Sequence, residues 1–426
     1  MDAKHIQFKN SKTLFLVMFL LYKVLLDIVY VYVTDAWAYE GFVNDFNEFL
    51  YAITFIWALF IGYTSYDYVK VCSGSSLMML VFNLMFFIPF TTVCSFSDFD
   101  PDFVFFTFLY WFILLLLYNY FVLHKPVHNR KISKDFRSFI YVLSVTIIVA
   151  NFLSTIYYNG FSVKFDLNDI YENRLKVRSL NLPTIIGYIK PTASCITLIL
   201  ITFFLTKRKW LLVTILTLLQ LMNFSFGALK SDFFALFLAF IFGLFYRDGY
   251  SKMLLPFLLL LTFFCLVEYK LVGDSVVSNY IYRRMFFMPP LISSQYYDFF
   301  SQHDLMYWRD SILRWVGVSN PYGMTLPRFM GTIFSPNEGA NLNTGIIGDD
   351  YAQFGFGSLV VYPLLWIFVM RVWDICTAYL NSSVVICSSI LVAITFISGT
   401  LFSSILTGGF LMMSLLCFSL SNYKGE

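Results

Sequence analysis

Long apolar runs divide the sequence, and they constrain its fold more than any other feature. Runs of about 18 to 22 residues, long enough as helices to cross a hydrocarbon core about 30 Å thick, recur along most of the chain. They lie at 13–33, 49–68, 76–95, 103–123, 137–157, 184–205, 209–226, 253–271 and 353–370, with a shorter run at 231–246. The stretch Ser382–Leu420 is interpreted as two more spans on either side of Ser398–Thr400. Because backbone polar groups in lipid must be hydrogen-bonded within their own segment, the runs predict an all-α integral membrane protein with about twelve transmembrane helices.

The composition excludes a soluble globular domain. The chain has 426 residues, of which 59% are hydrophobic and 13% charged, so too little polar surface would remain to face water. The seven cysteines have no CxxC spacing and the four histidines have no HExxH spacing. We therefore expect neither a disulfide framework nor a zinc site with cysteine ligands. The first apolar run lacks a small-residue cleavage site and is interpreted as a retained signal anchor.

The charges of the short loops predict how the chain crosses the membrane. Loops 34–48 and 96–102 contain Asp or Glu but no Lys or Arg, whereas loop 124–136 and the turn 207–209 are basic. Because cytoplasmic loops carry the excess of Lys and Arg, both termini are expected in the cytoplasm. This topology divides the chain into residues 1–271, with nine helices and an outer loop at 158–183, a large outer loop at 272–349, and residues 350–426, with the last three helices.

Arginine is concentrated in the two large loops of the expected outer face. Loop 272–349 contains no Lys, and its arginines are Arg283, Arg284, Arg309, Arg314 and Arg328. In loop 158–183, Arg174 and Arg178 share one face if their segment is helical. Arg binds phosphate through a planar fork and is disfavoured on the outer face, so its persistence there indicates an anionic substrate. Solvated surface charges and phospholipid anchors are the alternatives left open.

The large loop ends in a segment, 338–358, in which glycines alternate with amides and acids. Glycine permits close approach of the backbone to a ligand, and a helix that begins near Asp349 would direct its positive end outward. The residues expected to bind substrate here are Asn341, Asn343, Gly348 and Tyr351. The candidate proton acceptors are Asp349 and Asp350, followed by Glu338 and His303. A tight loop capped by Asp is the alternative interpretation.

Two lysines lie within the expected spans. Lys23 is near the middle of the first run and Asp27 follows one helical turn later, so we expect the two charges to neutralise each other. Lys190 lies about six residues inside the outer end of its run, next to Pro191, and is expected to contact an anionic substrate.

The chain resembles the Wzy-type O-antigen polymerases, also called oligosaccharide repeat-unit polymerases, of bacterial inner membranes. The resemblance covers most of the chain. It rests on many spans with two basic outer loops and on three segments, NRLKVRSLNLPTIIGYIKP (173–191), YRRMFFMPPLISSQYYDFF (282–300) and NTGIIGDDYAQFGFGS (343–358). It implies a GT-C-like glycosyltransferase that moves a growing glycan from undecaprenyl pyrophosphate onto a new lipid-linked repeat unit at the periplasmic face. The implied partners are the undecaprenyl-pyrophosphate-linked oligosaccharide, membrane lipids and a chain-length regulator protein, but no nucleic acid, nucleotide sugar or metal.

By position, the resemblance points to the arginines of both large loops. Our hypothesis assigns catalysis to Arg178, Arg284, Asp349 and Asp350, and substrate binding to Arg174, Lys190, Arg283, Arg314, Asn341, Asn343, Gly348 and Tyr351. Guanidinium groups that hold the departing pyrophosphate more strongly in the transition state would accelerate its departure. Arg does not deprotonate, so a carboxylate is expected to accept the proton.

Other functions fit parts of the pattern. An O-antigen ligase shares the donor, and a functional His303 would favour it. A flippase or transporter of the lipid-linked repeat predicts short loops and charges at the middle of the membrane, and the length of loop 272–349 argues against it. A metal-dependent GT-C transferase would use Asp35 and Glu40 as ligands, although membrane topology explains both acids more simply.

Overall fold

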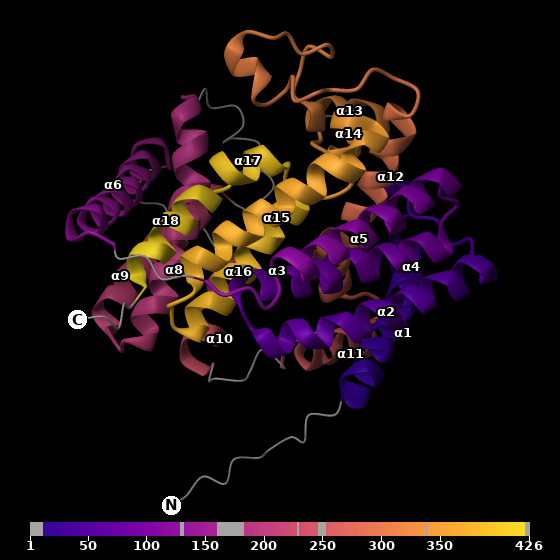
Figure 1. Cartoon of the computed structure of the whole chain (residues 1–426), viewed down its shortest axis with the longest axis horizontal. Coiled ribbons are helices and arrows are strands. Elements are labelled where there is room, and N and C mark those ends of the chain that lie inside the picture. The colour runs from indigo at the N-terminus through magenta and orange to yellow at the C-terminus, as the bar shows by residue number, and fades with distance from the viewer. Residues whose placement is uncertain are drawn as a thin grey trace, which may run out of the picture. The chain divides into compact units, whose positions relative to one another are not determined.

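The computed structural model describes residues 12–127, 132–159, 183–227, 230–245, 253–337 and 339–421 (Figure 1). Every regular element within these ranges is a helix. Eight helical stretches are long and apolar enough to cross a membrane, and they are Lys12–Glu40, Glu48–Val71, Gly74–Phe96, Pro101–Phe121, Lys134–Tyr158, Thr184–Thr206, Leu254–Val272 and Gly348–Thr377. This confirms an α-helical protein with several candidate membrane spans.

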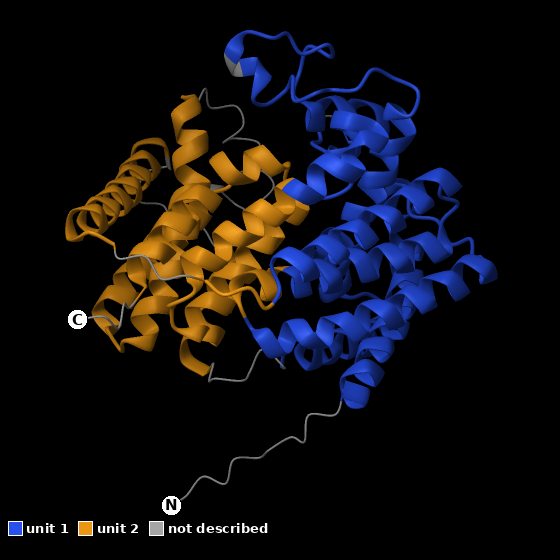
Figure 2. Cartoon of the chain, in the orientation of Figure 1, with its two compact units in different colours: residues 1–72, 79–123, 250–364 blue, residues 73–78, 124–249, 365–426 orange. Residues whose placement is uncertain are grey.

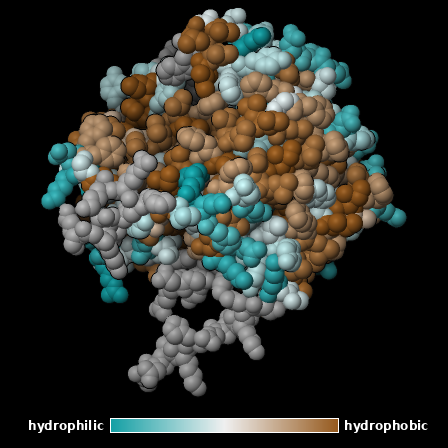
Figure 3. All heavy atoms as spheres, viewed as in Figure 1, coloured by the Kyte–Doolittle hydropathy of each residue, from teal (hydrophilic) through white to brown (hydrophobic). Residues whose placement is uncertain are grey.

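Four shorter apolar helices fall at the remaining expected runs. They are Trp210–Phe226, Phe233–Phe245, Ser382–Ser398 and Phe410–Leu420. A total of about twelve crossings and a GT-C-like arrangement stay predictions. Large apolar side chains are widely exposed, for example Leu271 and Tyr157, and apolar side chains cover most of the face shown in Figure 3. Such a surface is suited to lipid and not to water.

The chain folds into two compact units, each assembled from separate parts of the sequence (Figure 2). Unit 1 comprises residues 1–72, 79–123 and 250–364, and unit 2 comprises residues 73–78, 124–249 and 365–426. The sequence division at 271 and 349 followed the expected membrane topology. The units follow packing instead, because helices that are distant in the sequence bury a common core.

Unit 1 is built around α1 (Lys12–Trp37), which packs against α2 (Glu48–Val71), α4 (Ile88–Phe96) and α11 (Leu254–Val272). The π-helical segment η2 (Asn83–Phe87) precedes α4, and α5 (Pro101–Phe121) follows it. Asn83 joins these elements, because its side chain donates to Ser65 Oγ at 2.9 Å and accepts from Trp111 Nε1 at 3.0 Å. The polar atoms of this buried amide are thereby satisfied, as a low-dielectric core requires.

Unit 2 is centred on α8 (Thr184–Thr206). This helix packs against α6 (Lys134–Asn159), α9 (Trp210–Gly227), α10 (Lys230–Phe245), α16 (Ser382–Ser398) and α18 (Phe410–Leu420). Buried polar pairs join helices within the unit. For example, Gln220 Nε2 donates to Ser194 Oγ at 2.7 Å, and Asn151 Nδ2 donates to Asn223 Oδ1 at 3.3 Å. Side-chain hydrogen bonds of this kind associate helices within a membrane.

The stretch expected as one large loop begins with a helix instead. Residues 276–300 are continuously helical, first as the π-helix η4 (Ser278–Phe287) and then as α12 (Met288–Phe300). Ser275 caps the start of this helix, because its hydroxyl accepts the backbone N–H of Ser278 at 2.9 Å. η4 packs against α1 and α4, and Tyr282 is completely buried. About a third of the expected loop therefore belongs to the helical core of unit 1.

The two prolines explain the wide helical geometry that precedes α12. Pro289 and Pro290 donate no backbone hydrogen bond, and a proline ring clashes with the carbonyl four residues earlier. In η4 the hydrogen bonds reach one residue farther, as in the bond from Met288 N to Arg283 O. π-helical turns are often found at functional sites, and this one carries Arg283 and Arg284.

Candidate functional site

The helix formed by η4 and α12 carries both parts of the predicted site within unit 1. Arg283 and Arg284 lie in η4, and α12 packs against α14 (Gly348–Phe354), which contains Asp349 and Asp350. Ser293 of α12 also contacts the segment just before α14, because its hydroxyl oxygen lies 3.2 Å from that of Thr344. Arg284 and Ser293 are nine residues apart, roughly 13 Å along a helix axis. One helix therefore supports the arginines and the carboxylates at different positions along its length.

Arg283 is a buried structural residue. Its guanidinium forms an ion pair with Glu40, lies 3.6 Å from the ring centroid of Trp37, and donates through Nε to Asn279 O at 3.2 Å. The indole of Trp37 in turn donates to Asn279 Oδ1 at 2.7 Å. These contacts hold η4 against the end of α1. In this conformation Arg283 is not available to a substrate, contrary to its predicted role in binding.

Arg284 has a different environment from its neighbour. Its side chain is exposed, and no hydrogen bond or ion pair joins it to the rest of the described chain. Nearby protein atoms, together with the adjacent positive charge of Arg283, lower the pKa of Arg284, although Glu40 opposes this effect. The side chain still carries its charge at neutral pH. An exposed guanidinium that has no partner in the described chain can accept an anion.

The predicted carboxylates are almost completely buried. Asp349 is 2% exposed and Asp350 is 0% exposed. Tyr110 of α5 donates its hydroxyl to Asp350 Oδ2. Asp349 Oδ1 accepts from Gln353 Nε2 at 3.0 Å, and the same nitrogen lies 3.5 Å from Asp310 Oδ1. Gln353 thus links Asp349 to a third carboxylate, Asp310, from the preceding segment.

The backbone is strained directly before the two aspartates. Ile347 has φ +78° and ψ −66°, and the N–H of Gly348 bonds to Ile346 O at 3.1 Å, which defines a γ-turn. A β-branched residue rarely adopts a positive φ, and such strain is typical of functional sites. Gly348 lies against α12, where an added Cβ would meet the Ser293 Cα at 3.0 Å. Gly348 therefore allows close packing of α14 against α12, and its contact with substrate stays a prediction.

The other predicted residues of unit 1 that the structure describes lie in two environments. Asn341, Asn343 and Arg314 are exposed. Tyr351 is 5% exposed and packs against Tyr297 and Phe106, so its ring faces are not open to a sugar.

Four predicted residues are not part of this arrangement. Lys190 belongs to unit 2, where its Nζ lies 4.0 Å from the ring centroid of Phe226. Arg174, Arg178 and Glu338 lie outside the described residues.

Three contributors to the site were not predicted. Gln353 follows Asp349 by one helical turn, so its spacing was a usable signal. Asp310 had none, because it reaches Gln353 only through a turn of the chain. Tyr110 lies in an apolar run typical of a lipid-embedded helix. Glu40, the potential metal ligand, is paired with Arg283, and no group of three metal-binding side chains is found among the described residues.

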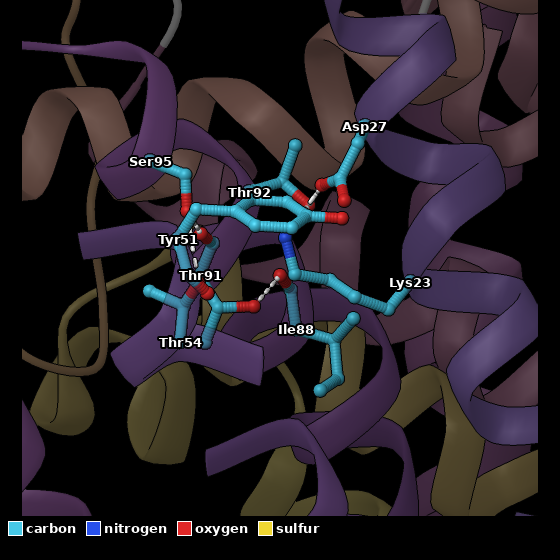
Figure 4. Close-up of polar contacts among 8 residues, drawn as sticks. All are labelled: Lys23, Asp27, Tyr51, Thr54, Ile88, Thr91, Thr92 and Ser95. Carbon is cyan, nitrogen blue, oxygen red and sulfur yellow. Dashed lines mark hydrogen bonds and ion pairs between the residues drawn. The ribbon is translucent and has the colours of Figure 1, made fainter. Parts of the chain in front are cut away.

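The ion pair expected within the first span is confirmed. Lys23 Nζ lies 2.5 Å from Asp27 Oδ1, and Thr92 Oγ1 of α4 donates to the same carboxylate oxygen at 2.8 Å. Figure 4 shows Lys23 and Asp27 directed toward Thr92, with the ring of Tyr51 from α2 beside them. This pair links α1 to α4 and belongs to the core of unit 1.

A comparison of the chain with protein-family models, curated proteins and solved structures finds no match in any of the three.

Proposed function

We propose that this protein is a membrane glycosyltransferase that polymerises undecaprenyl-pyrophosphate-linked oligosaccharide repeat units into O-antigen or a related surface polysaccharide. The reaction takes place at the periplasmic face of a bacterial inner membrane, and both termini lie in the cytoplasm. The partners are the lipid-linked oligosaccharide, the surrounding lipids and a chain-length regulator. The proposal rests on the apolar helices, on the resemblance described above and on the site of unit 1.

One observation carries the proposal furthest. The helix formed by η4 and α12 presents Arg284, an exposed arginine with no partner in the described chain. It also supports α14, which contains Asp349 and Asp350 and whose Gln353 contacts Asp310. A lipid-linked sugar has the matching chemistry, because its diphosphate is anionic and its sugar carries hydroxyl groups. Arg284 binds the diphosphate, and the carboxylate side of the helix faces the sugars.

Arg284 stabilises the leaving group in this reaction. A hydroxyl of the incoming repeat unit attacks the anomeric carbon of the growing glycan, and the bond to undecaprenyl pyrophosphate breaks. Negative charge grows on the departing phosphate oxygen, and a fixed guanidinium binds it more strongly as it grows. A charge-assisted hydrogen bond contributes about 1.5–3 kcal/mol, so loss of one such bond is expected to slow the reaction by about 10- to 200-fold.

The test is the lipopolysaccharide banding of cells that lack this gene and are complemented with variants. We expect the deletion strain to make core with a single repeat unit and no ladder, and the wild-type gene to restore the ladder. Arg284→Ala and Arg178→Ala are expected not to restore it, at verified membrane expression. Arg328→Ala serves as the matched control, because Arg328 is another exposed arginine within residues 272–349, and this variant is expected to restore the ladder.

Other patterns of banding identify the alternative functions. A deletion strain that loses every surface repeat, including the single one, points to ligation or to flipping of the lipid-linked repeat and contradicts polymerisation. His303→Ala separates these two, because ligation would depend on this exposed imidazole, which stacks on Phe299 at 3.9 Å.

A further inference from the structure

We propose that Asp310 is the residue that accepts the proton of the attacking sugar hydroxyl, with Asp349 and Gln353 as its positioning residues. This inference rests on the proposed function and names the proton acceptor of that same site. Asp349 and Asp350, the predicted acceptors, are 2% and 0% exposed. Asp310 is only partly buried and lies in the segment that carries Arg309 and Arg314. A base must reach the hydroxyl that it deprotonates, which favours Asp310.

Gln353 fixes the position of the Asp310 carboxylate from a rigid element. Its Oε1 accepts the backbone N–H of Trp308 at 2.6 Å, and its Nε2 donates to Asp349 at 3.0 Å. With both ends of the amide held, Nε2 lies 3.5 Å from Asp310 Oδ1. That bond is long, as bonds to catalytic groups often are before substrate is bound. Gln353 is itself 2% exposed, so its orientation does not depend on solvent.

The turn that delivers Asp310 is strained and is tied to α14. Tyr307 and Trp308 are consecutive residues with positive φ, +47° and +61°, a conformation that costs about 1–3 kcal/mol per residue. Backbone bonds from Met306 N to Ala352 O at 2.9 Å and from Tyr307 N to Gln353 O at 3.1 Å hold the turn against α14. The indole of Trp308 also donates to Tyr362 at 3.1 Å. Strain that is held in place so completely is typical of a preorganised site.

The electrostatic environment suits a proton acceptor. Burial raises the pKa of Asp310, while the hydrogen bond from Gln353 and the charge of Arg314 oppose the increase. Asp310 and Asp349 both lie close enough to Tyr296 to raise the pKa of its phenol further, after burial. A carboxylate that is disfavoured as an anion takes up a proton more readily.

The transfer step replaces one bond at the anomeric carbon with another. The Asp310 carboxylate takes the proton of the acceptor hydroxyl as the oxygen forms its bond to the anomeric carbon. The bond from that carbon to the phosphate oxygen breaks, and its electron pair leaves with undecaprenyl pyrophosphate, which Arg284 holds. Asp310 then returns its proton to water, and no other reactant is needed.

The test uses the purified full-length protein in lipid nanodiscs, supplied with lipid-linked repeat units. The rate of polymer formation is measured against pH for the wild type, Asp310→Asn, Asp310→Glu and Asp349→Asn. We expect Asp310→Asn to lower kcat by about 10²- to 10⁴-fold and to abolish the decline of rate at acidic pH, while binding of the repeat unit is kept. Asp310→Glu retains part of the rate. Asp349→Asn is expected to lower the pH below which the rate falls, because removal of a neighbouring negative charge lowers the pKa of Asp310.

Asp304→Asn is the matched control, because Asp304 is exposed in the same segment. It is expected to leave both the rate and its pH dependence unchanged. An Asp310→Asn protein that keeps the wild-type rate and acidic decline overturns the inference and leaves polymerisation intact. A wild-type protein that forms no polymer overturns the proposed function and the inference together. The elution profile of each variant on size exclusion establishes that it is folded.

Discussion

Lys23 and Asp27 form an ion pair of 2.5 Å in which both side chains are buried, at 0% and 8% exposure. Thr92 connects the pair to α4, since it accepts from Lys23 Nζ at 3.3 Å and donates to Asp27 at 2.8 Å. Either charge alone at this position would be left uncompensated in a low-dielectric environment. The two charges are therefore tolerated in an apolar helix only because they occur together.

Removal of one member of this pair is expected to destabilise unit 1 strongly. Lys23→Met or Asp27→Leu should each lower the free energy of unfolding by about 3–5 kcal/mol, because the remaining charge stays buried. The double variant should recover most of that loss, since apolar side chains of similar volume replace the pair. The measurement is unfolding of the purified protein in detergent. Single variants as stable as the wild type would show that the ion pair does not hold α1 to α4.

Substitution of Arg283 is expected to lower the stability of the protein, whereas substitution of Arg284 is expected to leave it almost unchanged. Arg283→Ala leaves the partly buried Glu40 without its partner, so the free energy of unfolding should fall by about 3–5 kcal/mol. Arg284→Ala should change stability by no more than about 0.5 kcal/mol, because the side chain is exposed. Melting curves and polymer ladders of both variants provide the comparison. Equal loss of stability in the two variants would contradict the separation of a structural arginine from a ligand-binding one.

The helices could be predicted from the sequence far better than the site. Apolar runs and the spacing of Lys23 and Asp27 are local patterns, and the structure contains a helix at each run and the ion pair at that spacing. The helix 276–300 was missed because Arg283-Arg284 and Pro289-Pro290 interrupt the apolar pattern. Polar residues are acceptable there because protein, and not lipid, surrounds them, and a hydropathy pattern does not distinguish the two.

The carboxylates illustrate why the site itself was only partly predicted. Asp349 and Asp350 were chosen for their glycine-rich surroundings, but Gly348, the glycine next to them, packs closely against Ser293. Asp310 becomes part of the group through the left-handed turn at Tyr307 and Trp308, and no local pattern predicts that two such residues will adopt positive φ. The contact of Tyr110 with Asp350 joins residues 240 positions apart, which one sequence does not reveal.

Asp298 is expected to make the stability of the protein depend on pH. Partial burial, and then the charge of Asp100, raise the pKa of Asp298 from 3.8 to about 6. Between these values the folded protein binds more protons than the unfolded chain, so this contribution to stability is complete below about pH 4 and is lost as pH rises through about 6. Asp298→Asn should therefore melt at a higher temperature than the wild type at pH 7.

The pH series supplies the control for this prediction. The difference in melting temperature between Asp298→Asn and the wild type should shrink toward zero as the pH falls to about 4, where the wild-type carboxyl group is protonated. The exposed Asp304 provides the matched substitution, Asp304→Asn, which changes a surface carboxylate of the neighbouring segment. A difference for Asp298→Asn that is constant from pH 4 to 7 would exclude titration of this group as its cause.

Gly348→Ala tests the packing of α14 against α12. The added Cβ would lie 2.8 Å from Thr344 Cγ2 and 3.0 Å from the Cα of Ser293, and the latter is backbone that does not rotate away. Overpacking of this kind costs about 1–3 kcal/mol, so the melting temperature should fall. Gly187→Ala in α8 is the matched control, because nothing lies within 4 Å of its added Cβ, and a gain of up to about 1 kcal/mol in helix propensity is expected. Since α14 also carries Gln353 and the two buried aspartates, Gly348→Ala should lower the rate of polymerisation as well. A Gly348→Ala protein that matches the wild type in both measurements would mean that α14 and α12 do not approach each other this closely.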